Sequence, residues 1–223
     1  MKALALDTST GRISAAAYNG STHASLILNL ELRQSEKLLP AVETVLREAE
    51  LTPADLDFVA LSSGPGSFTG LRLGFAALKA FQLSTGCPLY GVPTLQAYFY
   101  PFRDFSGTVV PVIDAKKERF YVSIYRNGKL SLEASDLSPE ELLGNIDREE
   151  DILVTGTDAP LCVEKLLELR PDQKFHVFSG KECFADYVLL CAEEMFKSGK
   201  APMQDYDGPV YIRQHDAEVP KTK

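Results

Sequence analysis

The sequence predicts an α/β protein made of two similar lobes, each with a mixed β-sheet flanked by helices. The same order of elements occurs twice: a strand, a hairpin, and then alternating helices and strands. Each hairpin is marked by an Asn-Gly pair, at Asn19-Gly20 and at Asn127-Gly128. Each first strand ends in an aspartate, Asp7 or Asp114. Because no residue identity between the halves is visible, the repeat is one of architecture.

The pattern of apolar residues places the elements of both lobes. We expect residues 1–104 to form the first lobe and residues 105–218 the second, with the end of the chain packing back on the first lobe. Predicted strands lie at residues 2–7, 12–18, 22–30, 57–61, 89–92, 108–113, 119–126, 129–134, 152–155 and 174–178. Predicted helices lie at residues 38–50, with Pro40 in the first turn, at 68–85, after Thr94, from Ser138, and at 159–169 and 182–197.

The segment 62–74 turns from a buried strand into the most apolar predicted helix. Gly64 and Gly66 allow backbone angles that a β-carbon would forbid, and Ser67 or Thr69 can cap the helix. The helix is apolar most of the way round, so it needs cover on two sides. Gly70 and Gly74, four residues apart, would let a second backbone come close.

Two interpretations of this glycine turn stay open. Free N–H groups and the positive dipole end at a helix N-terminus suit a phosphate. However, the spacing from Gly64 to Gly70 does not match G-x-x-x-x-G-K-[ST], and no lysine follows. A structural turn that allows close packing is therefore favoured over a phosphate site.

Composition excludes several classes of protein. The chain has 223 residues, 45% of them hydrophobic, and a net charge of −8, which argues against a protein that binds nucleic acid on its own. We expect a cytoplasmic protein with no membrane contact, because no signal peptide or membrane-spanning run is visible. Three scattered histidines predict no metal site. The four cysteines lack C-x-x-C spacing and are expected to be buried, reduced thiols: Cys87, Cys162, Cys183 and Cys191.

Several short motifs together carry a resemblance to a known family. They are residues 4–10 (LALDTST), 35–40 (SEKLLP), the glycine segment 64–74, 91–95 (GVPTL), 112–115 (VIDA), and a P-x-Y-x-R tail from Pro209 to Arg213. With these motifs the chain resembles the TsaB family, also called the YeaZ type, of bacterial tRNA threonylcarbamoyladenosine biosynthesis proteins.

The resemblance implies a fold and a role. The fold is that of the actin-like ATPases, with two RNase H-like lobes. The role is that of a non-catalytic partner subunit of TsaD, which works with the ATPase TsaE. TsaD transfers threonylcarbamoyl from its adenylate to the adenosine beside the anticodon. We expect a homodimer when the chain is alone, contact with tRNA only through the complex, and no cofactor of its own, with ATP and Mg used by the complex.

The resemblance also marks a departure. TsaD holds a metal with a paired-histidine motif in the helix after the hairpin, whereas residues 34–40 of this chain contain no histidine. Relatives commonly have histidine where this chain has Gln34. We interpret Gln34 as a surface or interface change, and we assign no catalytic residue.

The expected partner interface is the apolar outer face of the helices at 38–50 and 68–85. It comprises Leu38, Leu39, Val42, Leu46, Gly70, Leu71, Gly74, Phe75, Ala77, Leu78 and Phe81. A charge at Leu78 or Ala77 is expected to abolish pairing without unfolding the monomer.

The two aspartates have two interpretations. Asp7 and Asp114 match positions that face phosphates and Mg²⁺ in actin-like ATPases, and with Gly64 and Gly66 they would form a vestigial or weak nucleotide site. The alternative, which we favour, is that both aspartates cap turns at strand ends. Likewise, Lys116, Lys117 and Arg119 are interpreted as a solvated loop rather than a phosphate or tRNA contact.

An independent enzyme is the main alternative function, either an ATP-dependent transferase or a glycoprotease-like enzyme. Ser67 lacks the G-x-S-x-G context and an identifiable histidine partner, so the protease chemistry is unsupported. A role through self-association alone is a third possibility.

Overall fold

The computed structural model describes residues 1–30, 33–148, 151–178 and 182–213. Within these residues the chain forms two compact units. Lobe I comprises residues 1–101 and 182–209, and lobe II comprises residues 102–178 and 210–213.

Lobe I is built on a mixed five-stranded sheet with the strand order β3-β2-β1-β4-β5. Its strands are β1 (Ala3–Asp7), β2 (Arg12–Tyr18), β3 (His23–Asn29), β4 (Phe58–Gly64) and β5 (Leu89–Pro93). The hairpin strands β1, β2 and β3 pair antiparallel, whereas β4 runs parallel to both β1 and β5. The parallel pairs arise because a helix separates each of these strands from the previous one.

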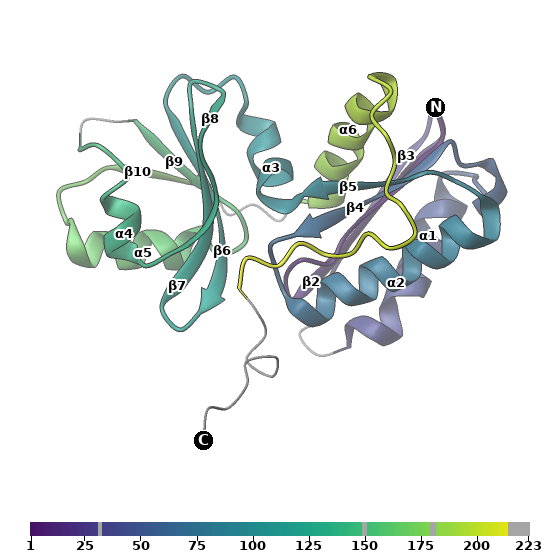
Figure 1. Ribbon diagram of the computed structural model, residues 1–223, viewed down its shortest axis with the longest axis horizontal. Helices are drawn as coiled ribbons and strands as arrows, with labels where there is room; N and C mark the ends of the chain where they lie inside the picture. Colours follow the sequence, from purple (N-terminus) through teal and green to yellow (C-terminus); the bar gives the residue numbers. More distant parts are fainter. Residues whose placement is uncertain (31–32, 149–150, 179–181, 214–223) are drawn as a thin grey trace. The chain divides into compact units, whose positions relative to one another are not determined.

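Helices cover both faces of this sheet (Figure 1). The helices of lobe I are α1 (Gln34–Glu48), α2 (Phe68–Thr85), α3 (Thr94–Phe99) and α6 (Phe184–Lys197), with short 3₁₀ turns η1 (Pro53–Asp55) and η2 (Tyr100–Phe102) at its loops. Leu4 and Leu6 of β1 join the core under α1 and α2. The alternate residues Ala3 and Ala5 are also fully buried, on the face that α6 contacts. Small side chains on this second face let α6 lie close to the sheet.

Lobe II repeats the same topology, with the strand order β8-β7-β6-β9-β10. Its elements are β6 (Thr108–Lys116), β7 (Arg119–Arg126), β8 (Lys129–Leu137), α4 (Pro139–Leu143), β9 (Ile152–Thr155), α5 (Ala159–Leu169) and β10 (Phe175–Phe178). Its core joins β6, β7 and β9 to α4 and α5. The two mixed sheets confirm the predicted fold class.

Two boundaries differ from the expectation. The first helix begins at Gln34, so Pro40 lies inside α1 and not in its first turn. The structure also places α6 in lobe I, although we expected residues 105–218 to form the second lobe, with only the end of the chain packing back on the first. The reason is that α6 contacts four strands of the first sheet, where Phe196 packs on Phe58 with ring centroids 5.2 Å apart. Residues 214–218 lie outside the described part of the chain.

All four cysteine thiols are buried, as expected. Burial raises the pKa of Cys87 to about 11 and the pKa of Cys162 and Cys183 to about 12. These thiols are therefore protonated and unreactive near neutral pH. Among the described helices, none combines the length and the apolar content that a bilayer crossing needs.

Candidate functional site

Asp7, at the end of β1, is a buried acceptor inside lobe I. One carboxylate oxygen accepts hydrogen bonds from the Ser9 N–H at 2.9 Å and from the Ser62 hydroxyl at 2.6 Å. The other accepts from the Tyr98 hydroxyl at 3.3 Å. A buried carboxylate must be matched by donors, and these three donors come from the turn, β4 and α3. Such contacts are those of a residue that caps a turn.

The glycine turn before α2 packs against the chain's own β1–β2 turn. A β-carbon added at Gly66, Gly70 or Gly74 would lie less than 3.0 Å from an atom of Thr8 or Ser9. Only glycine permits this approach. A second backbone does come close to Gly70, as predicted, whereas Gly74 meets the Thr8 side chain; both contacts lie within the same lobe. Gly70 and Gly74 therefore cannot belong to the outer face of α2, where we had placed them.

The same contact decides whether the turn fits a nucleotide phosphate, the group that the actin-like fold implies. The Ser67 N–H donates to the Ser9 carbonyl at 2.6 Å, and the Gly70 N–H donates to the Ser67 hydroxyl at 3.3 Å. The Gly64 N–H donates to the Thr94 hydroxyl at 3.2 Å. The Ser9 carbonyl and the Ser67 and Thr94 hydroxyls accept from these three N–H groups, so the donors are already used and the turn does not fit a phosphate.

Gln34 connects the start of α1 to the β1–β2 turn. Its side chain is buried, and its amide Nε2 donates to the Thr10 carbonyl at 2.7 Å. Of the two interpretations of Gln34, a surface or an interface change, the surface one is therefore wrong. The Gln34 amide thus supplies the hydrogen-bond donor for the Thr10 carbonyl in the β1–β2 turn. Asp7 stands at the start of the same turn.

Asp114, the counterpart of Asp7 in lobe II, is paired within its own turn. Its carboxylate accepts from the Lys116 N–H at 2.7 Å and from the Lys116 ammonium at 2.6 Å. The Asp114 carboxylate raises the pKa of Lys116 through this hydrogen bond. Lys116, Lys117 and Glu118 all have left-handed backbone angles, with φ between 57° and 60°. Among the described residues, no three potential ligands come together in a group that could hold a metal ion.

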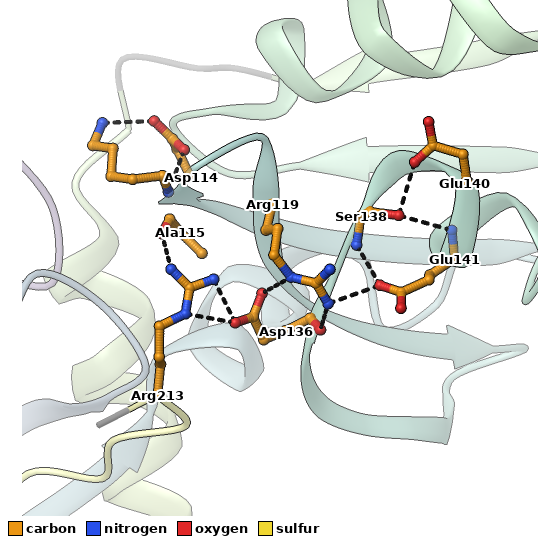
Figure 2. A network of polar contacts seen from close by, with 9 residues as sticks. Asp114, Ala115, Arg119, Asp136, Ser138, Glu140, Glu141 and Arg213 are labelled. Carbon is orange, nitrogen blue, oxygen red and sulfur yellow. Dashed lines mark hydrogen bonds and ion pairs between the residues drawn. The ribbon is translucent and has the colours of Figure 1, made fainter. Parts of the chain in front are cut away.

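A network around Asp136 anchors the P-x-Y-x-R tail to lobe II (Figure 2). Arg213 donates from Nε at 2.8 Å and from Nη2 at 2.5 Å to one oxygen of Asp136, and from Nη1 to the Ala115 carbonyl at 2.9 Å. Arg119 donates to the other oxygen of Asp136 at 2.9 Å and to Glu141 at 2.7 Å. Arg119 is thus part of a network and not of a solvated loop. Sequence reasoning noticed the tail but missed Asp136.

Most residues of the expected partner interface on α1 and α2 are not exposed. Eight of the eleven expected interface residues are buried in lobe I: Leu38, Val42, Leu46, Gly70, Leu71, Gly74, Phe75 and Leu78. Leu78 is 0% exposed, so a charge there would unfold the lobe, contrary to our expectation.

The apolar surface that remains open we call the α1–α2 face. It comprises exposed Leu39, Ala76, Ala80 and Leu83 and half-buried Ala77 and Phe81. Between the two helices lies an open groove of about 430 Å³, with Leu39, Leu46 and Phe81 among its lining residues. A face of this kind, next to a groove, is suited to a helix of another protein.

Comparisons with known proteins identify the family. Residues 31–185 match the family model "TsaD: tRNA N6-adenosine threonylcarbamoyltransferase". The tRNA threonylcarbamoyladenosine biosynthesis protein TsaB of Bacillus subtilis is 32% identical over 169 residues, which cover 72% of this chain and 73% of that protein. This chain belongs to the TsaB family. The TsaB of Escherichia coli is 29% identical over 97% of this chain and 96% of its own length.

Solved structures agree with this TsaB-family assignment. YeaZ from Pseudomonas aeruginosa superposes with a TM-score of 0.78 at 26% identity, covering 94% of this chain and 99% of that one. Component A of (R)-2-hydroxyglutaryl-CoA dehydratase from Acidaminococcus fermentans has a TM-score of 0.56 at 10% identity, covering 89% of this chain and 98% of that one. At this identity the likeness shows the fold alone. The TsaB-family chain therefore has the two-lobed actin-like fold that its motifs implied.

The glycine contact predicts an unusual sensitivity at one position. Gly70→Ala should destabilise lobe I by about 2 kcal/mol or more, because its methyl group would overlap the Thr8 carbonyl. Gly11→Ala is the matched control, since a β-carbon there meets nothing within 4 Å. Urea unfolding measures both free energies, and equal stabilities of the two variants would contradict the contact.

The Asp136 network predicts release of the tail. Asp136→Ala removes the carboxylate that Arg119 and Arg213 share. It should lower the free energy of unfolding of lobe II by roughly 1.5–3 kcal/mol. Hydrogen exchange of residues 209–213 should rise at the same time. Asp104→Ala is the control, because the Asp104 side chain is 98% exposed. Unchanged exchange in Asp136→Ala would show that Arg213 does not hold the tail.

Proposed function

We propose that this chain is a non-catalytic partner subunit of TsaD in the biosynthesis of threonylcarbamoyladenosine in tRNA. The observation that carries the proposal is the α1–α2 face, on which large and small apolar side chains stay open beside a groove. Small residues such as Ala76 and Ala80 let a second helix approach α2 closely. Leu39 and Leu83 then supply area to bury, since they are 54% and 78% exposed.

The energy available on such a face is adequate for a stable pair. Burying 600 Å² of apolar surface would contribute about 15 kcal/mol gross, before the costs of association remove much of it. TsaD, whose family model matches this chain over residues 31–185, would present a related helix pair. A second copy of this chain would do the same when TsaD is missing, which is the basis for proposing a homodimer.

The rest of the complex would supply what this chain lacks. Its net charge of −8 supports contact with tRNA only through the complex, because phosphate binding depends on clustered lysine and arginine. The filled glycine turn and the internally paired Asp7 and Asp114 support a chain with no cofactor of its own. ATP and Mg²⁺ would then be used by TsaD and TsaE.

An independent transferase is the second candidate, and the description of the matched TsaD family model favours it. It would need Asp7 and Asp114 to hold Mg²⁺. Against it stands the occupation of Asp7 by three donors from its own lobe.

Ala80→Glu tests the proposal, because it places a charge at an exposed position of the α1–α2 face. It should weaken co-purification with TsaD at least roughly tenfold, equivalent to about 1.4 kcal/mol. Reconstituted tRNA modification should fall in parallel to the level seen without the chain.

Leu161→Glu is the matched control, a charge at a 41% exposed leucine of α5 in lobe II. It should behave like the wild type in both measurements. If Ala80→Glu still co-purifies with TsaD and supports modification, the α1–α2 face is not the partner surface.

A further inference from the structure

We infer that the partner surface continues from α2 onto the C-terminal arm of lobe I, residues 199–209, where Tyr206 anchors a basic side chain of the partner protein. The inference rests on the proposed function, because it extends the surface that would meet TsaD. None of the arm residues belonged to the interface expected from the sequence.

Hydrogen bonds hold the arm beside α2 (Figure 1, yellow). The Gln82 side-chain amide donates to the Met203 carbonyl at 3.1 Å, and the Lys79 ammonium donates to the Gln204 carbonyl. The Met203 N–H donates to the Leu89 carbonyl of β5 at 2.8 Å. The arm therefore lies in a defined place along one flank of α2.

A tight turn at residues 204–207 presents Tyr206. The Gln204 N–H donates to the Asp207 carboxylate at 2.7 Å, and the Asp207 N–H donates back to the Gln204 carbonyl at 3.1 Å. Tyr206, between them, is 88% exposed. An aromatic ring on a turn that is already ordered loses little further freedom on binding, and tyrosine is enriched among residues that dominate interfaces.

The arm that carries Tyr206 is hydrogen-bonded to α2, the helix that bears most of the α1–α2 face. Lys79 and Gln82, which hold the arm, lie in the same helical turns as the exposed Ala80 and Leu83. Tyr206 and Leu83 are the two most exposed large apolar side chains in the described part of the chain. A single exposed apolar side chain is common on protein surfaces and would not by itself indicate a binding surface. In the inferred surface, Leu83 contributes from α2 and Tyr206 from the arm that is hydrogen-bonded to α2.

The charges around Tyr206 indicate which kind of partner side chain would contact its ring. Asp205, the residue before Tyr206, is exposed, while the Asp207 carboxylate accepts the hydrogen bond that closes the turn. An arginine or lysine of the partner can lie over the ring in a cation–π contact and pair with Asp205 at the same time. The acidic chain, with a net charge of −8, also favours a basic partner surface.

Calorimetric titration of the full chain into purified TsaD tests the inference. Tyr206→Ala should weaken binding at least about tenfold, as expected for an aromatic anchor. Tyr206→Phe keeps the ring and should bind within about twofold of the wild type, whereas Asp205→Asn should weaken binding and reduce its salt dependence. Leu130→Ala, at an exposed leucine of β8 in lobe II, is the control and should have no effect.

The outcomes separate this inference from the proposed function. If the wild type binds TsaD and Ala80→Glu does not, while Tyr206→Ala binds like the wild type, the arm is not part of the surface and only the inference fails. If the wild type itself does not bind TsaD, the proposed function fails. Because Tyr206 is exposed, circular dichroism of Tyr206→Ala should match the wild type, so weaker binding reports the lost contact.

Discussion

The close approach of the β1–β2 turn to the start of α2 is the contact on which lobe I depends. Gly66, Gly70 and Gly74 make it possible, since any side chain there would overlap Thr8 or Ser9. The contact fixes the first turn of α2 against the strand that ends in Asp7, and Gln34 ties α1 to the same turn. This contact also determines which side of α2 faces the sheet and which side faces outward.

The same contact removes the glycine turn as a phosphate site in this chain. Backbone of the same lobe fills the place where a phosphate would meet the helix N-terminus, and Asp7 accepts hydrogen bonds from three donors of lobe I. In lobe II, with the same topology, Asp114 pairs with Lys116 of its own turn. What lobe I leaves open is the α1–α2 face, the surface on which the proposed role in binding another protein rests.

Local patterns predicted the elements well and their surroundings less well. Helix α2 spans residues 68–85, as predicted, and the Asn-Gly turns placed both hairpins. A helix that is apolar all round gives no period from which to tell its inner from its outer side, so buried Leu71, Phe75 and Leu78 were assigned to the interface. Arg213 and Asp136 are 77 residues apart, and no sequence spacing connects them. The packing of α6 on the first sheet could not be predicted either, because it depends on which of the two sheets still has an uncovered face.

The central claim is that the glycine turn is filled by the chain itself and does not receive a phosphate. Isothermal titration calorimetry of the isolated, full-length chain with Mg-ATP tests this most directly. The account predicts no saturable heat at millimolar nucleotide. Saturable one-to-one binding in the micromolar range, lost in Asp7→Asn, would contradict it.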